Sequence, residues 1–231
     1  MLKLQKNNEP GKLIVFEGTD GAGKTTLIRM TIEYLTRSVG EDRIVVQKQP
    51  TDLSRKTKLF QKMMYCKNHD DISYRAVQLL TLSDRIQHNQ EVILPALKEG
   101  KIVICDRYVY TSVANMLARG YAHEKWFFMA GREIIKPDVA FLAYVDPDTA
   151  IKRIKSRPEE CNRHLDETLL KSVAANFMRY RKRWDLQLVE TDRDAEQSFE
   201  EVKKRLDGIK GEGNDRNRSQ ICNGHIAGKN A

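Results

Sequence analysis

The most specific pattern in the chain is a glycine-rich segment that fits GxxxxGK[ST] and runs from Gly18 to Thr25 (GTDGAGKT). It follows the apolar run KLIVFE, typical of a buried strand, and opens a segment with helical apolar spacing. In this context the glycines let successive backbone N–H groups point at phosphate oxygens, and the helix N-terminus adds partial positive charge. The segment therefore predicts a site for the phosphates of a nucleotide. The residues expected to form it are Gly18, Asp20, Gly21, Ala22, Gly23, Lys24, Thr25 and Thr26.

Three side chains of this segment have expected roles. Lys24 should reach the β- and γ-phosphates, Thr25 should offer its hydroxyl to Mg²⁺, and Thr26 should contact the α-phosphate. Many classes of protein share such a site, so the segment indicates a nucleotide without indicating a reaction.

A second polar pair, Asp106 and Arg107, follows the strand-like run KIVIC. In a parallel sheet the pair emerges at the same carboxyl edge as the glycine-rich turn. A carboxylate there can hold Mg²⁺ through its water shell, and a guanidinium can grip a phosphate with its planar fork. The alternative is a helix-capping aspartate beside a surface arginine.

Strand and helix patterns alternate along the chain, which predicts an α/β fold with a parallel sheet covered on both faces. The expected strands span 12–17, 44–47, 101–105, 139–145 and 186–190. The expected helices span 25–39, 74–98, 111–118, 148–157, 167–184 and 196–209.

The composition indicates a globular protein and excludes disorder throughout. Of 231 residues 40% are hydrophobic and 31% charged, with a net charge of +8. The longest apolar run has seven residues (139–145), whereas a membrane span needs roughly 20, and the first residues lack a signal-peptide pattern. We therefore expect a cytoplasmic protein whose four cysteines are reduced. The basic excess fits an anionic substrate, a nucleic-acid surface or solvated lysines.

Three parts are expected along the chain: a polar extension (1–11), one domain (12–209) and a disordered tail (210–231). His88 and His164 have no partner at metal-ligand spacing, so we interpret them as surface or hydrogen-bonded core groups. The run from Trp126 to Met129 is interpreted as helix or interface packing.

Four stretches resemble the thymidylate kinases, a family of nucleoside monophosphate kinases. They are FEGTDGAGKTT, SDRIQHNQEVILPALKEGKIVICDRYVYTSVA, KPDVAFLAYVDPDTAIKRIKSR and the weaker RYRKRW, and together they span most of 12–209. The resemblance implies a P-loop NTPase fold with a five-stranded parallel sheet in the order 2-3-1-4-5, a short lid near 155–167, and a homodimer. It also implies ATP and Mg²⁺ as cofactors, with Thr25 and Asp106 at the metal.

The resemblance also assigns residues to the acceptor nucleotide. Asp20 is similar to the carboxylate that binds the sugar 3′-hydroxyl, Arg107 to the arginine that grips the transferred and acceptor phosphates, and Arg85 to the arginine that reads the base. The remaining residues expected on the acceptor side are Lys48, Pro50, Thr81, Tyr108 and Met116.

Gly21 stands where some members of the family carry an arginine, and members with glycine there take a catalytic arginine from the lid. Arg157 and Arg163 lie in the expected lid, and Arg153, one helical turn earlier, is expected to face the adenine side. A solvated basic helix end is the alternative for these arginines.

Three departures from the family affect the acceptor pocket. Thr81 replaces a phenylalanine that stacks on thymine, Asn115-Met116 replaces Tyr-Gln, and Lys48-Gln49-Pro50 replaces Arg-Glu-Pro. Stacking is worth about 1 to 3 kcal/mol per base, so its loss weakens acceptor binding unless neighbours such as Tyr108, Tyr110 or Phe60 compensate.

The expected reaction is ATP-dependent phosphorylation of a deoxynucleoside monophosphate, most simply dTMP to dTDP. The first alternative is a kinase of the same fold acting on a modified pyrimidine nucleotide or on a nucleotide within DNA, in line with the altered pocket and the basic charge. The second is a regulatory protein that binds nucleotide without transferring phosphate. Retention of Asp20, Arg85 and Arg107 argues against the second alternative.

Overall fold

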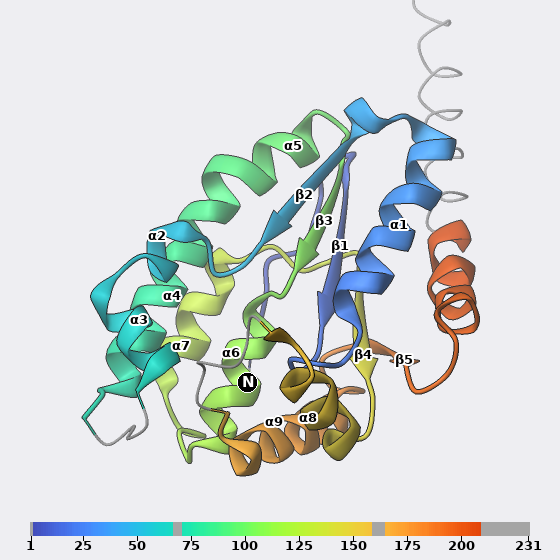
Figure 1. Ribbon diagram of the computed structural model, residues 1–231. Helices are drawn as coiled ribbons and strands as arrows, with labels where there is room; N and C mark the ends of the chain where they lie inside the picture. The colour runs from blue at the N-terminus through green and yellow to red at the C-terminus, as the bar shows by residue number, and fades with distance from the viewer. Residues whose placement is uncertain (1, 67–70, 159–164, 209–231) are drawn as a thin grey trace, which may run out of the picture.

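The computed structural model describes residues 2–66, 71–158 and 165–208. These residues form a five-stranded, entirely parallel sheet in the order β2-β3-β1-β4-β5 (Figure 1), which confirms the expected topology. The strands are β1 (Lys12–Glu17), β2 (Ile44–Lys48), β3 (Ile102–Asp106), β4 (Val139–Tyr144) and β5 (Leu186–Glu190).

The central strand β1 is apolar along its length because both of its faces are covered. Leu13 and Val15 belong to one hydrophobic cluster, and Ile14 and Phe16 belong to the other. Side chains of a strand alternate between the two faces of a sheet, so a strand buried on both faces has a continuous apolar run.

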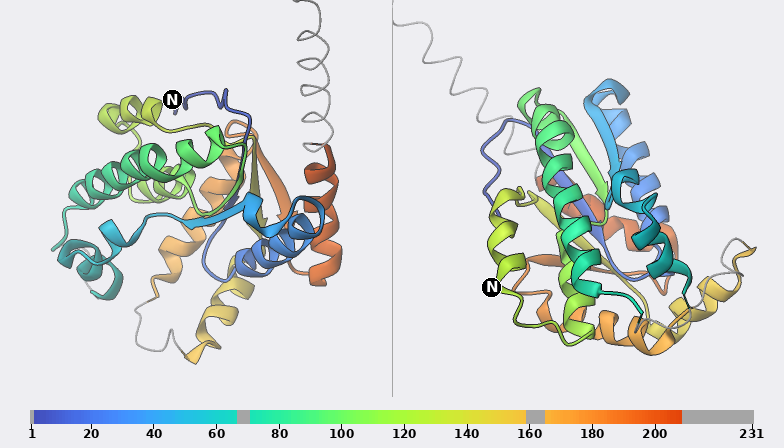
Figure 2. Two further views of the ribbon diagram at one scale, coloured as in Figure 1. Left: turned by 90° about the horizontal axis from the view of Figure 1, so that it is seen from above. Right: turned by 90° about the vertical axis from the view of Figure 1, so that its left-hand side faces the viewer.

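Helices pack on both sides of the sheet (Figures 1 and 2). One face carries α4 (Tyr74–His88), a π-helical turn η2 (Asn89–Ile93), α5 (Leu94–Lys98), α6 (Val109–Ala118), α7 (Lys125–Ala130) and two of the four buried residues of α9 (Glu167–Tyr180). The other face carries α1 (Lys24–Val39), α8 (Pro147–Lys155) and a helix described over 195–208. Shorter elements are η1 (Glu41–Arg43), α2 (Asp52–Arg55), α3 (Lys58–Tyr65) and η3 (Gly131–Glu133).

Most helix ends agree with the sequence signals. Gly40 closes α1 with a φ of 88°, and its N–H donates to the carbonyl of Thr36 at 3.0 Å. Pro147 begins α8 behind the capping carboxylate of Asp146, as expected for a proline in the first turn. The helix expected over 167–184 ends at Tyr180, and the one expected over 148–157 ends at Lys155.

Two short helices, α2 and α3, were not expected from the sequence, whereas the third, α7, lies where the sequence was interpreted as helix or interface packing. The first two follow β2 and carry side chains to the site described below. The third contains the aromatic run, where Phe127 is buried in the core as helix packing requires.

The first residues of the described chain pack against the domain. Gln5 forms a parallel bridge with Ile135, while Leu2 and Leu4 contact the core cluster beneath α7. Among the described residues, no helix combines the length and apolar character that a membrane span requires. Cys105 is a buried free thiol, whereas Cys161 and Cys222 lie outside the described residues.

The sheet register brings two loops to one edge. Phe16 of β1 pairs with Asp106 of β3, so the residues that follow each strand emerge side by side at the carboxyl edge. The glycine-rich turn and Arg107 are therefore neighbours although more than 80 residues separate them.

Candidate active site

The turn between β1 and α1 adopts a conformation that requires glycine. Gly18, Gly21 and Gly23 have φ angles of 137°, 78° and 82°. A Cβ atom on Gly18 would lie 2.4 Å from the carbonyl oxygen of Ala143, and one on Gly21 would lie 2.4 Å from that of Ala150. The turn therefore curls tightly against β4 and α8 and leads into the N-terminus of α1.

Lys24 extends back over this turn. Its ammonium donates to the carbonyl oxygens of Thr19 at 2.7 Å and Gly18 at 3.1 Å. Burial, with a smaller contribution from the charge of Arg107, lowers the pKa of Lys24 to about 7. Phosphate oxygens placed in the turn favour the charged ammonium, which is the condition under which a lysine serves this role.

Arg107 connects the two loops. It has a φ of 67°, and its backbone N–H donates to the carbonyl of Phe16 at 2.9 Å. Its guanidinium donates to the carbonyl oxygen of Gly18 at 2.9 Å and forms an ion pair with Asp20. The fork of the guanidinium is thus held beside the glycine-rich turn.

Glu17 holds this arrangement in place, and the sequence analysis missed it. Its buried carboxylate accepts the backbone N–H groups of Tyr108 and Thr111, each at 3.0 Å, and the Thr111 hydroxyl. Burial raises the pKa of Glu17, while these hydrogen bonds and the charge of Arg107 oppose the rise. The only sequence signal was a carboxylate at the end of a buried strand, directly before the glycine-rich turn.

Asp106 and Thr25 provide oxygen ligands of the kind that Mg²⁺ prefers. One carboxylate oxygen of Asp106, Oδ1, is buried without a hydrogen-bond partner among the described residues, and Oδ2 lies 3.8 Å from the ammonium of Lys48. Thr25 is exposed on the first turn of α1. No group of three metal-binding His, Cys, Asp or Glu side chains occurs in the described part of the chain. This donor set suits an ion that keeps waters and shares substrate phosphates.

Arg55 is a second residue that the sequence analysis missed. It ends α2, and its Nε donates to the carbonyl of Pro50 at 2.6 Å. Burial lowers the pKa of Arg55, and so does the charge of Arg107, whereas Asp106 and Asp20 raise it. These interactions place a further cation close to the Arg107 and Asp20 pair.

The arginines near the expected lid differ in position. Arg153 of α8 donates to the carbonyl oxygen of Thr191 at 2.8 Å and to that of Gly21 at 3.4 Å, so it lies against the glycine-rich turn. Arg157 follows α8 and is exposed. Arg163 and His164 lie outside the described residues.

Residues expected on the acceptor side are largely buried between α4 and α6. Thr81 and Arg85 of α4 and Met116 of α6 are each at most 3% exposed. Tyr108 is not brought to the site, because its ring is in the core and its hydroxyl donates at 2.8 Å toward both Asn89 and the carbonyl of Ile135. Tyr110 is also buried, which leaves Phe60, whose ring lies 5.7 Å from the guanidinium of Arg55.

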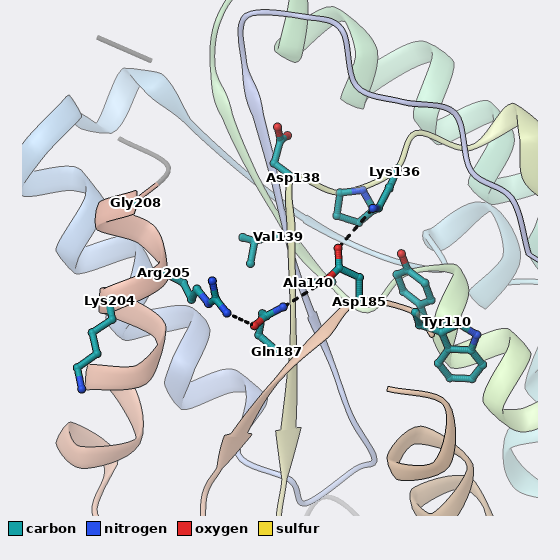
Figure 3. A pocket seen from close by; sticks show the side chains of 12 residues that line it. Tyr110, Lys136, Asp138, Val139, Ala140, Asp185, Gln187, Lys204, Arg205 and Gly208 are labelled. Atoms are coloured by element: carbon teal, nitrogen blue, oxygen red, sulfur yellow. Dashed lines mark hydrogen bonds and ion pairs between the residues drawn. The ribbon is translucent and has the colours of Figure 1, made fainter. Parts of the chain in front are cut away.

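Two hollows lie at different edges of the sheet. One, of about 510 Å³, lies beside β2, α2 and α4 and is lined by Lys48, Pro50 and Arg55, among others. The other, of about 300 Å³, lies at the opposite edge (Figure 3). Its polar groups pair with one another, Lys136 with Asp185 at 3.4 Å and Arg205 with Gln187 at 2.8 Å. None of the predicted site residues lines the second hollow.

Known proteins resemble this chain over most of its length. Residues 16–206 match the family described as Thymidylate kinase. A probable thymidylate kinase from Pyrococcus horikoshii is 39% identical over 150 residues, covering 64% of this chain and 71% of the relative. One from Thermococcus kodakarensis is 30% identical over 206 residues, covering 86% and 98%.

A crystal structure of thymidylate kinase from Ehrlichia chaffeensis superposes with a TM-score of 0.65 at 24% identity, covering 85% of this chain and 98% of that one. It supports the P-loop NTPase fold that the sheet order and the glycine-rich turn already define. Because the family match spans most of the chain and curated relatives are covered over most of their length, the chain belongs to the thymidylate kinase family of phosphotransferases.

Proposed function

We propose that the chain transfers the γ-phosphoryl group of ATP to the 5′-phosphate of dTMP, giving ADP and dTDP. The observation that best supports this is Arg107, which joins the glycine-rich turn to Asp20 across the carboxyl edge. A fork in that position can contact a phosphoryl group in transit between donor and acceptor.

The donor side rests on the turn from Gly18 to Thr26. Its backbone N–H groups and Lys24 bind the β- and γ-phosphates, and Arg153 borders the adenine side. Thr25 and Asp106 would hold Mg²⁺, which neutralises charge on the phosphates when bound.

The acceptor side needs positioning and charge more than proton transfer. A nucleoside monophosphate has a second pKa of about 6, so its phosphate is largely dianionic at neutral pH and requires no general base. Asp20 is assigned to the sugar hydroxyl, Arg107 and Arg55 to the phosphate, and Arg85 to the base. Lys48 and Pro50 border the same side from the end of β2.

Lid closure supplies the remaining cation. The glycine-rich turn itself contains no arginine, and a Cβ atom on Gly21 would lie 2.4 Å from the carbonyl oxygen of Ala150. We assign that role to Arg157 or Arg163 of the lid, which would also exclude water during transfer. We further infer a homodimer in the cytoplasm, in keeping with the family resemblance.

The test is ADP formation with MgATP and a panel of nucleoside monophosphates and DNA. We expect turnover with dTMP. No ADP above the hydrolysis background with dTMP or dUMP would contradict the proposal, and turnover with DNA alone would select the nucleic-acid alternative. Arg107→Ala should reduce dTMP turnover at least about hundredfold while leaving ATP binding nearly unchanged, because its fork contacts the transferred group. Equal loss of ATP binding would contradict the role assigned to Arg107.

A further inference from the structure

The first turn of α6 is capped by a residue of another element. Tyr108, at the N-cap position of α6, provides no side-chain hydrogen bond to that turn. The carboxylate of Glu17, at the end of β1, takes its place, because Oε1 accepts the backbone N–H groups of Tyr108 and Thr111, each at 3.0 Å. A carboxylate at a helix N-terminus also meets the partial positive charge there. Glu17 therefore fixes the start of α6 against the end of β1.

The side chain of Thr111 makes a further contact with Glu17. Its hydroxyl donates to Oε2, and a hydroxyl has only one proton to donate. A lone pair of the same oxygen accepts NH1 of Arg107 at 3.3 Å. The Thr111 hydroxyl can accept from Arg107 because its own proton is directed at Glu17.

The other partners of the Arg107 guanidinium belong to the glycine-rich turn. NH1 also donates to the carbonyl oxygen of Gly18 at 2.9 Å, and NH2 pairs with Asp20. Thr111 instead belongs to a helix of ten residues whose first turn is held by Glu17. The hydroxyl thus ties the guanidinium to a regular element of the fold.

The contact with Thr111 also differs from the contact with Asp20 in what substrate does to it. Asp20 is assigned to the sugar hydroxyl of the acceptor, so substrate competes with Arg107 for its carboxylate. Glu17 is fully buried, and neither it nor Thr111 is assigned to a substrate. The Thr111 hydroxyl can therefore hold NH1 with the site empty and with both nucleotides bound.

We propose that Thr111 is a positioning residue for phosphoryl transfer: its hydroxyl, oriented by Glu17, holds the Arg107 guanidinium in the direction that contacts the transferred group. Donors that are already oriented stabilise the charge of a transition state without having to reorganise during the reaction. The inference rests on the proposed phosphorylation of dTMP and adds to it two residues that act through Arg107.

Thr111→Val tests the hydroxyl. Valine has nearly the shape of threonine but loses both hydrogen bonds, so we expect kcat with dTMP to fall about tenfold and the KM for ATP to stay within about twofold. Thr111→Ser keeps the hydroxyl and should restore most of the lost turnover. Thr168→Val, at an exposed position of α9, is the matched control and should behave as wild type.

Glu17→Gln tests the direction of the hydroxyl without removing it. The amide keeps one oxygen for the backbone N–H groups of Tyr108 and Thr111, but it turns an NH2 donor toward the Thr111 hydroxyl. That hydroxyl then accepts from the amide and directs its proton at NH1 of Arg107, so that two donors face each other. We expect a fall in kcat similar to that of Thr111→Val, in a protein whose core volume is unchanged. This variant decides the question if Thr111→Val does not fold.

A double-mutant cycle with Arg107→Ala shows whether the effect passes through the guanidinium. In the Arg107→Ala protein, Thr111→Val and Glu17→Gln should change the residual turnover by less than about twofold, because the group that they orient is absent. A merely structural role would lower turnover equally in both backgrounds.

Two results would overturn the inference: an undiminished loss in the Arg107→Ala background, or a kcat equal to that of wild type in both Thr111→Val and Glu17→Gln. With normal turnover of dTMP by the wild type, the proposed function would stand in either case. Absence of dTMP turnover in the wild type would contradict the proposed function and this inference together.

Discussion

Arg55 adds positive charge to a site that already holds Lys24 and Arg107. Two carboxylates, Asp20 and Asp106, face these three cations. Burial lowers the pKa of both Arg55 and Lys24, which means that the folded protein bears a cost for holding these charges away from water. Bound phosphate groups offset that cost, so the electrostatics of the site favour an anionic acceptor as well as an anionic donor.

Replacing Arg55 tests whether it contributes to binding of the acceptor nucleotide and not to binding of ATP. Arg55→Gln should raise the KM for dTMP about tenfold or more, because a charge-assisted hydrogen bond to phosphate is lost, and should leave ATP affinity within about twofold. Steady-state kinetics and titration with a fluorescent ATP analogue measure the two effects. Lys56→Gln is the matched control, since Lys56 is exposed and paired with Asp52. An unchanged KM for dTMP would remove Arg55 from the acceptor site.

The local sequence pattern predicted those site residues that lie in a motif of adjacent residues. The glycine-rich turn, Lys24 and Arg107 follow strands, and the structure brings them together at one edge as expected. Their roles in transfer stay predictions. Glu17 and Arg55 could not be found in this way, because what distinguishes them is contact with residues on other elements. Glu17, for example, binds Tyr108 and Thr111, over 90 positions away.

The long helix expected over 74–98 shows that the local pattern also fails to predict an element where contacts with distant residues decide its shape. The structure interrupts it with the π-helical turn η2 before Pro95, which lacks an N–H and cannot continue regular α-helical hydrogen bonding. Asn89, the first residue of η2, links this turn to other elements. Its side-chain oxygen accepts hydrogen bonds from the Tyr108 hydroxyl at 2.8 Å and from the N–H of Ile135 at 3.1 Å. The sequence shows Pro95, which indicates an interruption of the helix, but it does not show which residues form hydrogen bonds with Asn89.

The contact between β2 and α4 should make stability depend on pH. His88 is held between Gln47 and Gln49, at 3.0 Å and 2.9 Å, which confirms the interpretation of a hydrogen-bonded core histidine. Burial lowers the pKa of His88 below 6.5, Arg85 lowers it further, and Asp84 and Glu91 oppose the shift. As pH falls through 6.5 the unfolded chain binds the proton first, so the free energy of unfolding decreases.

Urea unfolding at pH 7.5 and 5.5 measures this dependence. Wild type should lose more stability between these pH values than His88→Gln, which has no imidazole to protonate. His123→Gln removes an exposed histidine and should follow the wild type. Equal losses in wild type and His88→Gln would show that the β2 and α4 contact does not depend on a neutral imidazole.

At the scale of the whole molecule, alternating strand and helix patterns predicted a parallel sheet covered on both faces, because the strands are short, largely apolar and followed by helices. The order of the strands was implied by the resemblance to the thymidylate kinases, and the structure confirms it. The missed helices α2 and α3 have at most eight residues, too few for a periodic pattern to stand out. The proposed donor and acceptor sites account for part of the net charge of +8, because we assign to them Lys24, Lys48, Arg55, Arg85, Arg107 and Arg153. A nucleic-acid partner is not needed to account for it.

Two truncations test where the functional molecule ends. Residues 210–231 lie outside the described part of the chain, and every residue assigned to ATP or dTMP precedes them, so a chain ending at residue 209 should keep kcat/KM for dTMP within about twofold. A chain ending at residue 194 also loses Phe199, Val202 and Leu206, which are buried against α1. Each large buried side chain contributes about 2 to 5 kcal/mol, and the total stability of a domain is about 5 to 15 kcal/mol. The shorter chain should therefore fail to fold, as circular dichroism would show, whereas lost activity in the longer chain would give 210–231 a role in catalysis.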